Sequence, residues 1–284
     1  MFIPRKILED RLKEILSEDI GEGDVTSSAV IPPNLAIKAA IVSKEEGVAA
    51  GMEEASILAE YLSLTVKAKV ADGDMIQNGE VIMEIKGDAR TILSAERTLL
   101  NLISRMCGIA TATRTLKEKL QKAGAKARIA ATRKSAPGLL YFDKKAVMIG
   151  GGDTHRVHLD DMILIKDNHL AIVGGVEAAV KKAKANTSFS KKIEVEVTSS
   201  EDALKAAKVG ADIIMLDNFS PQQVKDTSDL LRKSNFSRIL LEVSGNVKSE
   251  NLLEFAASQV DIISMGELTH SVKGLDVSLE ITKN

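Results

Sequence analysis

The sequence predicts an α/β protein, an incomplete β/α barrel of about seven strands that follows a smaller N-terminal α+β sandwich domain. From Ala127 onward, short β-rich runs alternate with helical runs, which is typical of a parallel sheet covered by helices. Charged residues follow many of these runs, and this favours a closed barrel over an open doubly wound sheet. The expected parts are an N-terminal domain with its connecting helix at 1–112, a catalytic barrel at 113–270 and a segment at 271–284 that returns to the N-terminal domain.

The N-terminal domain is expected to begin with a helix and continue as short strands. Apolar residues from Ile7 to Ser17 recur with helical spacing, and two glycines then end the helix. From Ala36 onward the pattern changes to short strands, in which Asp-Gly and Asn-Gly pairs mark hairpin turns. A helix is expected at Met52 to Tyr61, and Arg90 to Gly124 should form one or two longer helices with a break at Gly108.

The barrel strands are short β-rich runs separated by helical runs. The strands are RIAAT, MILIK, IEVEV, IIMLD, ILLEV and DIISM, and the helices lie at Gly175 to Ala185, Ser200 to Val209, Pro221 to Lys233 and Ser249 to Ser258. Two of the strands, Lys126 to Thr132 and Met162 to Lys166, carry basic residues at their C-terminal ends. That end is the reactive face of a barrel, so we expect these residues in the active site.

Composition excludes several classes of protein. A chain of 284 residues with 44% hydrophobic and 27% charged residues is typical of a soluble globular protein. A net charge of -2, only 3% aromatic residues and no Trp argue against a nucleic-acid partner, because phosphate backbones favour a basic surface and single strands favour aromatic stacking. The charged N-terminus does not resemble a secretory signal, and no apolar run approaches the ~20 residues that cross a bilayer.

The single cysteine, Cys107, indicates a protein without an internal disulfide framework, which suits a cytoplasmic location. It lies in an apolar helical run, and free cysteine is commonly buried, so we interpret it as a core residue rather than a nucleophile. The run Gly150-Gly151-Gly152 is not a GxGxxG motif, and no Walker lysine pattern is present. The sequence therefore does not favour dinucleotide binding.

The stretch from Ala131 to His169 concentrates positive charge among glycines and apolar residues. Its cations are Arg133, Lys134, Lys144, Lys145, His155, Arg156 and Lys166. A solvated surface loop does not need this arrangement, and guanidinium groups bind carboxylates and phosphates in bidentate fashion. The stretch therefore predicts a site for a polyanionic small molecule, although His155 alone could equally be a structural histidine.

Carboxylates and glycines follow the later strands. Glu194 and Glu196 share one face of their strand by two-residue alternation, and Asp217 ends the next strand. Such carboxylates can hold Mg²⁺ or a ribose hydroxyl, or can pair with a barrel lysine. The last two strands end in glycine-containing turns, where backbone N–H groups can approach a phosphate. The candidate phosphate-binding residues are Ser244, Gly245, Asn246, Met265, Gly266 and His270.

Several segments, in order along nearly the whole chain, resemble the quinolinate phosphoribosyltransferase family, also called nicotinate-nucleotide pyrophosphorylase. They are EDIGEGDVT, AERTLLNLISRMCGIAT, TRKSAPGL, GGGDTHR, LIKDNH, IEVEV, IIMLDN and the stretch from LLEVSGN to LTHS. Two positions depart from the family, because many relatives have Asn where Thr154 stands and Gly where His158 stands. These departures concern fine contacts with the acceptor, since the basic residues remain in place.

The resemblance implies transfer of phosphoribose from phosphoribosyl pyrophosphate to quinolinate with decarboxylation, and with Mg²⁺ as cofactor. It also implies a homodimer or dimer-based oligomer with shared sites, in which Arg97 contacts the acceptor in the neighbouring subunit. Without the resemblance, Arg97 would be interpreted as a solvated charge on a helix. The implied carboxylate-binding residues are Arg97, Arg133, His155 and Arg156, with Lys134 and Lys166 between acceptor and pyrophosphate. The implied catalytic residues are Lys134, Lys166, Glu196 and Asp217, and the last two are also the expected magnesium ligands.

Three alternatives remain at this point. A relative that uses nicotinate as acceptor would need fewer cations, because nicotinate lacks the second carboxylate. A Schiff-base aldolase on Lys166 would need a lysine of lowered pKa and would leave the phosphate-binding glycines without a purpose. The hairpins between Leu64 and Ala89 resemble a biotinyl or lipoyl carrier, but they display no lysine at a hairpin tip.

Overall fold

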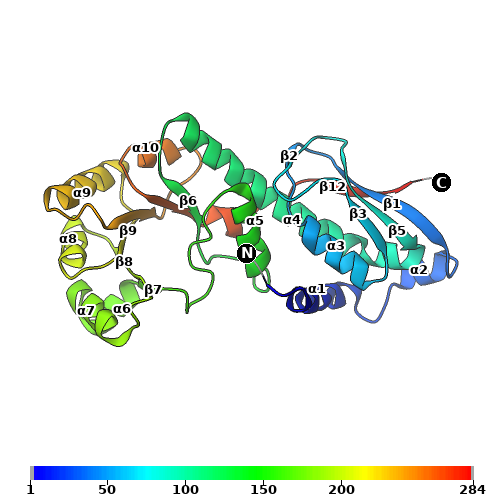
Figure 1. Ribbon diagram of the computed structural model, residues 1–284, viewed down its shortest axis with the longest axis horizontal. Coiled ribbons are helices and arrows are strands. Elements are labelled where there is room, and N and C mark those ends of the chain that lie inside the picture. Colours follow the sequence, from blue (N-terminus) through cyan, green and yellow to red (C-terminus); the bar gives the residue numbers. More distant parts are fainter. Residues whose placement is uncertain (1–2, 283–284) are drawn as a thin grey trace. The chain divides into compact units, whose positions relative to one another are not determined.

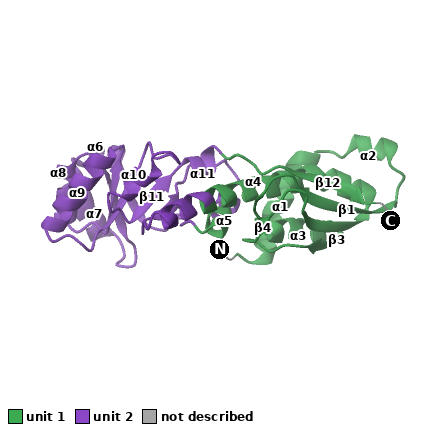
Figure 2. Ribbon diagram, turned by 90° about the horizontal axis from the view of Figure 1, so that it is seen from above, with its two compact units in different colours: residues 1–114, 145–151, 272–284 green, residues 115–144, 152–271 purple. Residues whose placement is uncertain are grey.

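The computed structural model describes residues 3–282, which fold as an α/β protein. The chain forms two compact units, coloured separately in Figure 2. The N-terminal unit contains the described residues up to 114 together with 145–151 and those from 272 onward, and the barrel unit contains 115–144 and 152–271. Segment 145–151 thus belongs to the N-terminal unit, although the residues on both sides of it belong to the barrel unit.

The N-terminal unit is built on an antiparallel sheet of four strands in the order β12-β1-β5-β3. The strands are β1 (Ala36–Ser43), β3 (Thr65–Ala68), β5 (Val81–Asp88) and β12 (Val277–Thr282), with a separate pair β2 (Gly47–Val48) and β4 (Met75–Ile76), and the shorter helices are α1 (Arg5–Ile20), α2 (Val25–Val30) and α3 (Met52–Tyr61). The predicted turns occur at Asp72-Gly73 and Asn78-Gly79. Lys38 of β1 lies opposite Thr282 of β12, so the C-terminal segment completes this sheet.

Helix α4 (Ala89–Lys122) is continuous over 34 residues, so the break predicted at Gly108 does not occur. The helix buries one face, on which Ala95, Leu99 and Met106 are fully buried. A side chain at Gly108 would overlap the carbonyl oxygen of Lys273 and would lie 3.0 Å from the Cα of Gly274. Glycine therefore permits close packing of a later segment against the helix, and it does not interrupt the helix.

The barrel unit contains a parallel sheet of six strands in the order β6-β11-β10-β9-β8-β7. The strands are β6 (Arg128–Ala131), β7 (Ile163–Ile165), β8 (Ile193–Val197), β9 (Ile213–Asp217), β10 (Leu240–Ser244) and β11 (Ile262–Met265). The helices that follow α4 are α5 (Leu140–Gly150), α6 (Asp167–Val173), α7 (Val176–Asn186), α8 (Ser200–Lys208), α9 (Pro221–Lys233), α10 (Leu252–Ala256) and α11 (Glu267–His270), and Figure 1 labels most of these elements. An isolated bridge between Ala130 and Asp153 lies beside β6 where a seventh strand would stand. The predicted incomplete barrel is confirmed, and its seventh strand is reduced to that bridge.

Two-residue alternation separates the core of the barrel unit from the site. Val195, Ile214, Val243 and Ile263 are fully buried in the hydrophobic cluster that also includes Ala203 and Ala206 of α8 and Val224 of α9. The intervening residues of the same strands are mostly polar and face the other side of the sheet.

Helix α9 begins with a capping box, in which the side chain of Ser220 accepts from the backbone N–H of Gln223. Among residues 3–282, no helix is long and apolar enough to span a membrane.

Candidate active site

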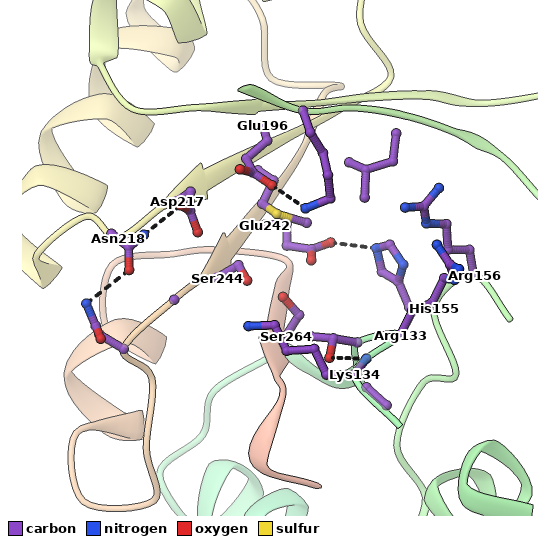
Figure 3. Close-up of a pocket in the computed structure, with 17 residues that line it drawn as sticks. Arg133, Lys134, His155, Arg156, Glu196, Asp217, Asn218, Glu242, Ser244 and Ser264 are labelled. Atoms are coloured by element: carbon purple, nitrogen blue, oxygen red, sulfur yellow. Dashed lines mark hydrogen bonds and ion pairs between the residues drawn. The ribbon is translucent and has the colours of Figure 1, made fainter. Parts of the chain in front are cut away.

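A cavity of about 560 Å³ opens at the C-terminal ends of the barrel strands (Figure 3). It lies entirely within the barrel unit and is lined by Ala131, Thr132, Arg133, Lys134, His155, Arg156, Leu164, Lys166, Glu196, Met215, Asp217, Asn218, Glu242, Ser244, Gly245, Asn246 and Ser264. Ten of the residues predicted from the sequence are therefore brought together: Arg133, Lys134, His155, Arg156, Lys166, Glu196, Asp217, Ser244, Gly245 and Asn246.

One side of the cavity is cationic. Figure 3 shows Arg133, His155 and Arg156 on one side and Asp217 and Asn218 on the other. Arg133 is exposed, whereas Arg156 is 9% exposed. Burial, and then the positive charge of Arg133, lower the pKa of the Arg156 guanidinium. An anion between the two guanidinium groups would offset this repulsion, so this side of the cavity suits a ligand with carboxylates.

His155 is held between two carboxylates that the sheet directs into the barrel. Its Nε2 lies 3.0 Å from Oε2 of Glu242 and 3.2 Å from Oε2 of Glu194, and both glutamates are fully buried. Burial alone would lower the pKa of His155, but the interactions with the two glutamates outweigh it and raise that pKa to about 10. His155 is therefore an imidazolium at neutral pH.

Glu242 was not predicted as a site residue, although the alternation of β10 contains the signal. Glu242 and Ser244 share a face of that strand, just as Glu194 and Glu196 share a face of β8, so the prediction of Ser244 could have been extended two residues back. Asn218, Thr132 and Ser264 also line the cavity without having been predicted. Their side chains are neutral, so neither charge nor spacing distinguished them from other strand ends.

Two lysines reach the cavity from neighbouring elements. Nζ of Lys166, directly after β7, lies 2.7 Å from Oε2 of Glu196. The backbone of Lys134 is held at both its amide and its carbonyl, because its N–H donates to Oγ1 of Thr132 at 3.2 Å and its C=O accepts from Oγ1 of Thr269 at 2.6 Å. The side chain of Lys134 is thus presented from a fixed backbone.

The side opposite the cations is built by the loops after β9 and β10. Nδ2 of Asn218 donates to Oδ2 of Asp217 at 2.6 Å, and Nδ2 of Asn246 donates to Oδ1 of Asn218 at 3.0 Å. Gly245 has φ +78°, and a Cβ there would overlap Oδ1 of Asn218 and lie 3.0 Å from Oδ1 of Asp217. Glycine at 245 therefore brings the two loops together. Burial, and then the charge of Glu196, raise the pKa of Asp217.

The remaining predicted phosphate residues do not line this cavity. Met265 is buried with its side chain in the hydrophobic core, and His270 is exposed with Nδ1 2.6 Å from Oγ of Ser271. A Cβ at Gly266 would lie 3.0 Å from Cδ2 of His270 and 3.2 Å from Cδ of Lys134. Gly266 and His270 are therefore neighbours of the Lys134 side chain.

Arg97 is exposed on α4 in the N-terminal unit and is not among the residues that line the cavity. Its delivery to the acceptor from a neighbouring subunit remains a prediction.

The two residues that depart from the family, Thr154 and His158, are not among those that line the cavity. The C=O of Thr154 accepts from Lys144, and His158 is exposed, with its backbone N–H donating to Oδ2 of Asp161 at 2.9 Å.

Two cations of the basic stretch do not join the cavity, which corrects the expectation that they converge there. Lys144 is fully buried, and its ammonium donates to the carbonyls of Ala131 and Thr154, which precede the two basic segments of the site. Burial lowers the pKa of Lys144 to about 8. Lys145 pairs with Glu53, and with Oε1 of Glu54 at 2.6 Å, inside the N-terminal unit. Consecutive helical residues point about 100° apart, and this separates the two lysines.

Local contacts explain the residues after Lys166 and the single cysteine. Nδ1 of His169 accepts from the backbone N–H of Lys166 at 2.9 Å, and Asp167 accepts from the N–H of Asn168 at 2.7 Å, so these residues shape the start of α6. Cys107 is fully buried, and burial raises its pKa to about 12. A thiol of that pKa is inert, as expected of a core residue.

The fold and the cavity together define a β/α-barrel enzyme for a polyanionic substrate. Comparison with known families covers most of the chain. Residues 24–107 match the N-terminal domain, and residues 109–280 the C-terminal domain, of quinolinate phosphoribosyl transferase. The chain belongs to the quinolinate phosphoribosyl transferase family.

Relatives of known name and structure are similar over the full length. The chain is 46% identical over 273 residues to a protein of Methanothermobacter thermautotrophicus named probable nicotinate-nucleotide pyrophosphorylase, carboxylating, with 96% of this chain and 98% of the relative covered. The structure of the nicotinate-nucleotide pyrophosphorylase from Francisella tularensis is similar with a TM-score of 0.90 at 35% identity, covering 99% of this chain and 98% of that one. NadC from Streptococcus pyogenes has the same TM-score and identity, with 100% of both chains covered.

Proposed function

We propose that the protein transfers phosphoribose from phosphoribosyl pyrophosphate to quinolinate and releases CO₂, which yields nicotinate mononucleotide and pyrophosphate for NAD synthesis. Family membership supports this reaction. The observation that carries it is the division of one cavity into a side with Arg133, His155 and Arg156 and an opposite side with Asp217 and Asn218. Gly245 adjoins Asn218 and Asp217. A dicarboxylate suits the first side, and a ribose phosphate suits the second.

The cationic side explains the choice of acceptor. Quinolinate carries two adjacent carboxylates, whereas nicotinate carries one. Two guanidinium groups and an imidazolium can bind both carboxylates through charge-assisted hydrogen bonds, and the mutual repulsion of Arg133 and Arg156 decreases as the dianion enters. A monocarboxylate would leave part of this positive charge unneutralised, so we expect nicotinate to bind weakly.

Mg²⁺ is proposed as the cofactor, and the residues present fit it. Glu196 and Asp217 are close enough for the charge of one to raise the pKa of the other, and Mg²⁺ is commonly held by one or two carboxylates together with substrate phosphates. Glu196 and Asp217 would hold the ion, with Lys166 released from Glu196. When bound, Mg²⁺ neutralises charge on the departing pyrophosphate.

The reaction needs positioning and charge stabilisation more than it needs a general base. The ring nitrogen of quinolinate forms a bond to the anomeric carbon of the ribose while the bond from that carbon to pyrophosphate breaks. The nitrogen is then positively charged, and when the adjacent carboxylate leaves as CO₂ the electron pair of the broken C–C bond stays on ring carbon 2. The positive nitrogen stabilises this carbanion, which then takes up a proton. Arg133 and Arg156 hold the acceptor in line, and Lys134 and Lys166 stabilise the negative charge that moves to pyrophosphate.

We further propose a homodimer, or a dimer-based oligomer, in the cytoplasm. Arg97 is exposed on α4, as a residue that contacts a second copy must be in the single chain. In a mixed dimer of Arg97→Ala and Arg133→Ala chains, one site would contain both intact residues. Partial return of activity on mixing the two inactive variants would support shared sites, and no return would reject them.

The test of the reaction is release of labelled CO₂ from quinolinate labelled at the 2-carboxylate, with omission of phosphoribosyl pyrophosphate, Mg²⁺ or protein in turn. Release that requires all three, with an equal amount of nicotinate mononucleotide, supports the proposal. Arg133→Ala should abolish it, whereas Arg128→Ala, an exposed arginine at the opposite end of the same strand, should not. If the folded protein instead forms nicotinate mononucleotide from nicotinate without releasing CO₂, the acceptor is nicotinate and not quinolinate.

A further inference from the structure

Two fully buried carboxylates in the barrel have no part in the reaction described above. Glu194 of β8 and Glu242 of β10 lie on either side of the His155 imidazole. Within residues 3–282, both oxygens of Glu194 and Oε1 of Glu242 lack hydrogen-bond partners. Burial of a carboxylate that is not fully hydrogen-bonded lowers the stability of the folded protein. A cluster that lowers stability is a candidate for a functional role.

The cluster acts on a single ring atom. Nε2 of His155 faces an oxygen of each glutamate, at 3.0 and 3.2 Å, while His155 also lines the cavity. Nδ1 of this ring has no hydrogen-bond partner among the described residues. The backbone supports the same orientation, because His155 adopts φ +50° and its N–H donates to Oδ1 of Asp153 at 2.8 Å. That conformation is uncommon outside glycine and costs about 1–2 kcal/mol, so the contacts around His155 must hold its backbone in place.

We propose that Glu194 and Glu242 are positioning residues for the acceptor. Glu242 accepts a hydrogen bond from Nε2–H of His155, Glu194 adds a carboxylate 3.2 Å from the same atom, and together they keep an Nδ1–H available to donate to an acceptor carboxylate. This inference rests on the proposed function, because it takes the ligand of the cationic side to be quinolinate. Glu242 lines the cavity, but the role assigned here to both glutamates does not require either of them to bind a substrate. They act through His155, by keeping both ring nitrogens protonated.

The charges around the ring support this role. The imidazolium faces Glu194 from β8 and Glu242 from β10, while Met215 of β9, between those strands, contributes no charge. Arg156 follows in the chain, and the charge of Glu194 raises its pKa against the effects of burial and of Arg133. The acidic groups that face the imidazolium and the guanidinium are thus Glu194 and Glu242, although burial, and then the charge of Glu242, raise the pKa of Glu194. Without the acids, burial would favour a neutral ring, which donates from only one nitrogen.

The test compares Glu242→Gln and Glu194→Gln with wild type and with Glu54→Gln, a matched control for a fully buried carboxylate in the N-terminal unit. We expect each site variant to raise the KM for quinolinate about tenfold or more at about pH 8, while kcat and the KM for phosphoribosyl pyrophosphate change little. At about pH 6 the deficit should shrink, because the ring then regains its proton from solvent. The wild-type KM should be flat over this range, and Glu54→Gln should match wild type.

A second readout is independent of activity. Nitrogen NMR of the four histidines distinguishes a doubly protonated ring from a neutral one, and the His155→Gln variant assigns the signal. We expect an imidazolium in wild type at neutral pH and a neutral ring in Glu242→Gln.

Three results would overturn the inference. They are an increase in the KM for quinolinate that is equal at all pH values, a neutral His155 ring in wild type, and a divalent metal bound stoichiometrically at these three side chains, whose ligand atoms lie close enough to share an ion. Failure of wild type to release CO₂ from quinolinate would instead reject the proposed function. Wild-type CO₂ release with unaffected glutamate variants would reject this inference alone.

Discussion

Replacing Gly245 by Ala tests the loop that forms the side of the cavity opposite the cations. Gly245 has φ +78°, where an L-residue costs roughly 1–2 kcal/mol. The new Cβ would also overlap Oδ1 of Asn218 and lie 2.8 Å from its Cγ, so Asn218 must move and its bond from Asn246 is lost, at about 1 kcal/mol more. We expect unfolding in urea to require about 2–3 kcal/mol less free energy, and the KM for phosphoribosyl pyrophosphate to rise about tenfold.

Gly124→Ala is the matched control for the backbone cost. Gly124 belongs to the same unit and has φ +68°, and a Cβ there meets nothing within 4 Å. It should lose only the roughly 1–2 kcal/mol of the conformational cost and keep both KM values unchanged. If Gly245→Ala and Gly124→Ala have the same stability and the same KM for phosphoribosyl pyrophosphate, the argument that glycine at 245 joins the two loops is wrong.

Three further predictions concern the N-terminal unit. Gly108→Ala should lower the free energy of unfolding by about 2–3 kcal/mol in urea titrations, because its Cβ overlaps the backbone at Lys273, and a smaller loss would mean that this segment moves aside easily. The Cys107 thiol, with a pKa raised to about 12 by burial, should resist a thiol reagent at about pH 8 until urea unfolds the protein; reaction in the native state would contradict its burial. Lys145→Met should lower the free energy of unfolding by about 3–5 kcal/mol, because the Glu54 carboxylate is left buried without its cation. The double variant with Glu54→Gln should recover part of that loss, and urea unfolding of both variants measures it.

Most of the barrel site could be predicted because its residues stand at strand ends. The β-rich runs and the glycines after them locate the reactive edge of a parallel sheet, and Lys166, Asp217 and Ser244 occupy that edge. Two-residue alternation then distinguishes the cavity face from the core face, as with Glu196 and Val195. Such local patterns predict the position of a residue in the folded sheet, because the strands are short and all run in the same direction.

The errors arose where distant contacts determine the outcome. Gly108 looks like a helix break because glycine has a low helix propensity, but its role depends on the backbone at 273–274, more than 150 residues later in the chain. Lys144 and Lys145 look equivalent to Arg133 in the sequence, yet one stabilises two backbone carbonyls and the other pairs with acids of the N-terminal unit. Charge alone does not reveal a partner on another element.

The single bridge between Ala130 and Asp153 has a consequence for how the barrel could evolve or be redesigned. A full seventh strand would engage the backbone after Asp153 in ladder hydrogen bonds and would force extended dihedral angles on His155. The imidazole would then no longer turn toward Glu194 and Glu242. Under the proposed role of His155, gains in stability from completing the barrel would come at the expense of acceptor recognition. A sequence library that selects only for thermal resistance at residues 154–158 should then drift toward well-folded proteins that no longer bind the acceptor.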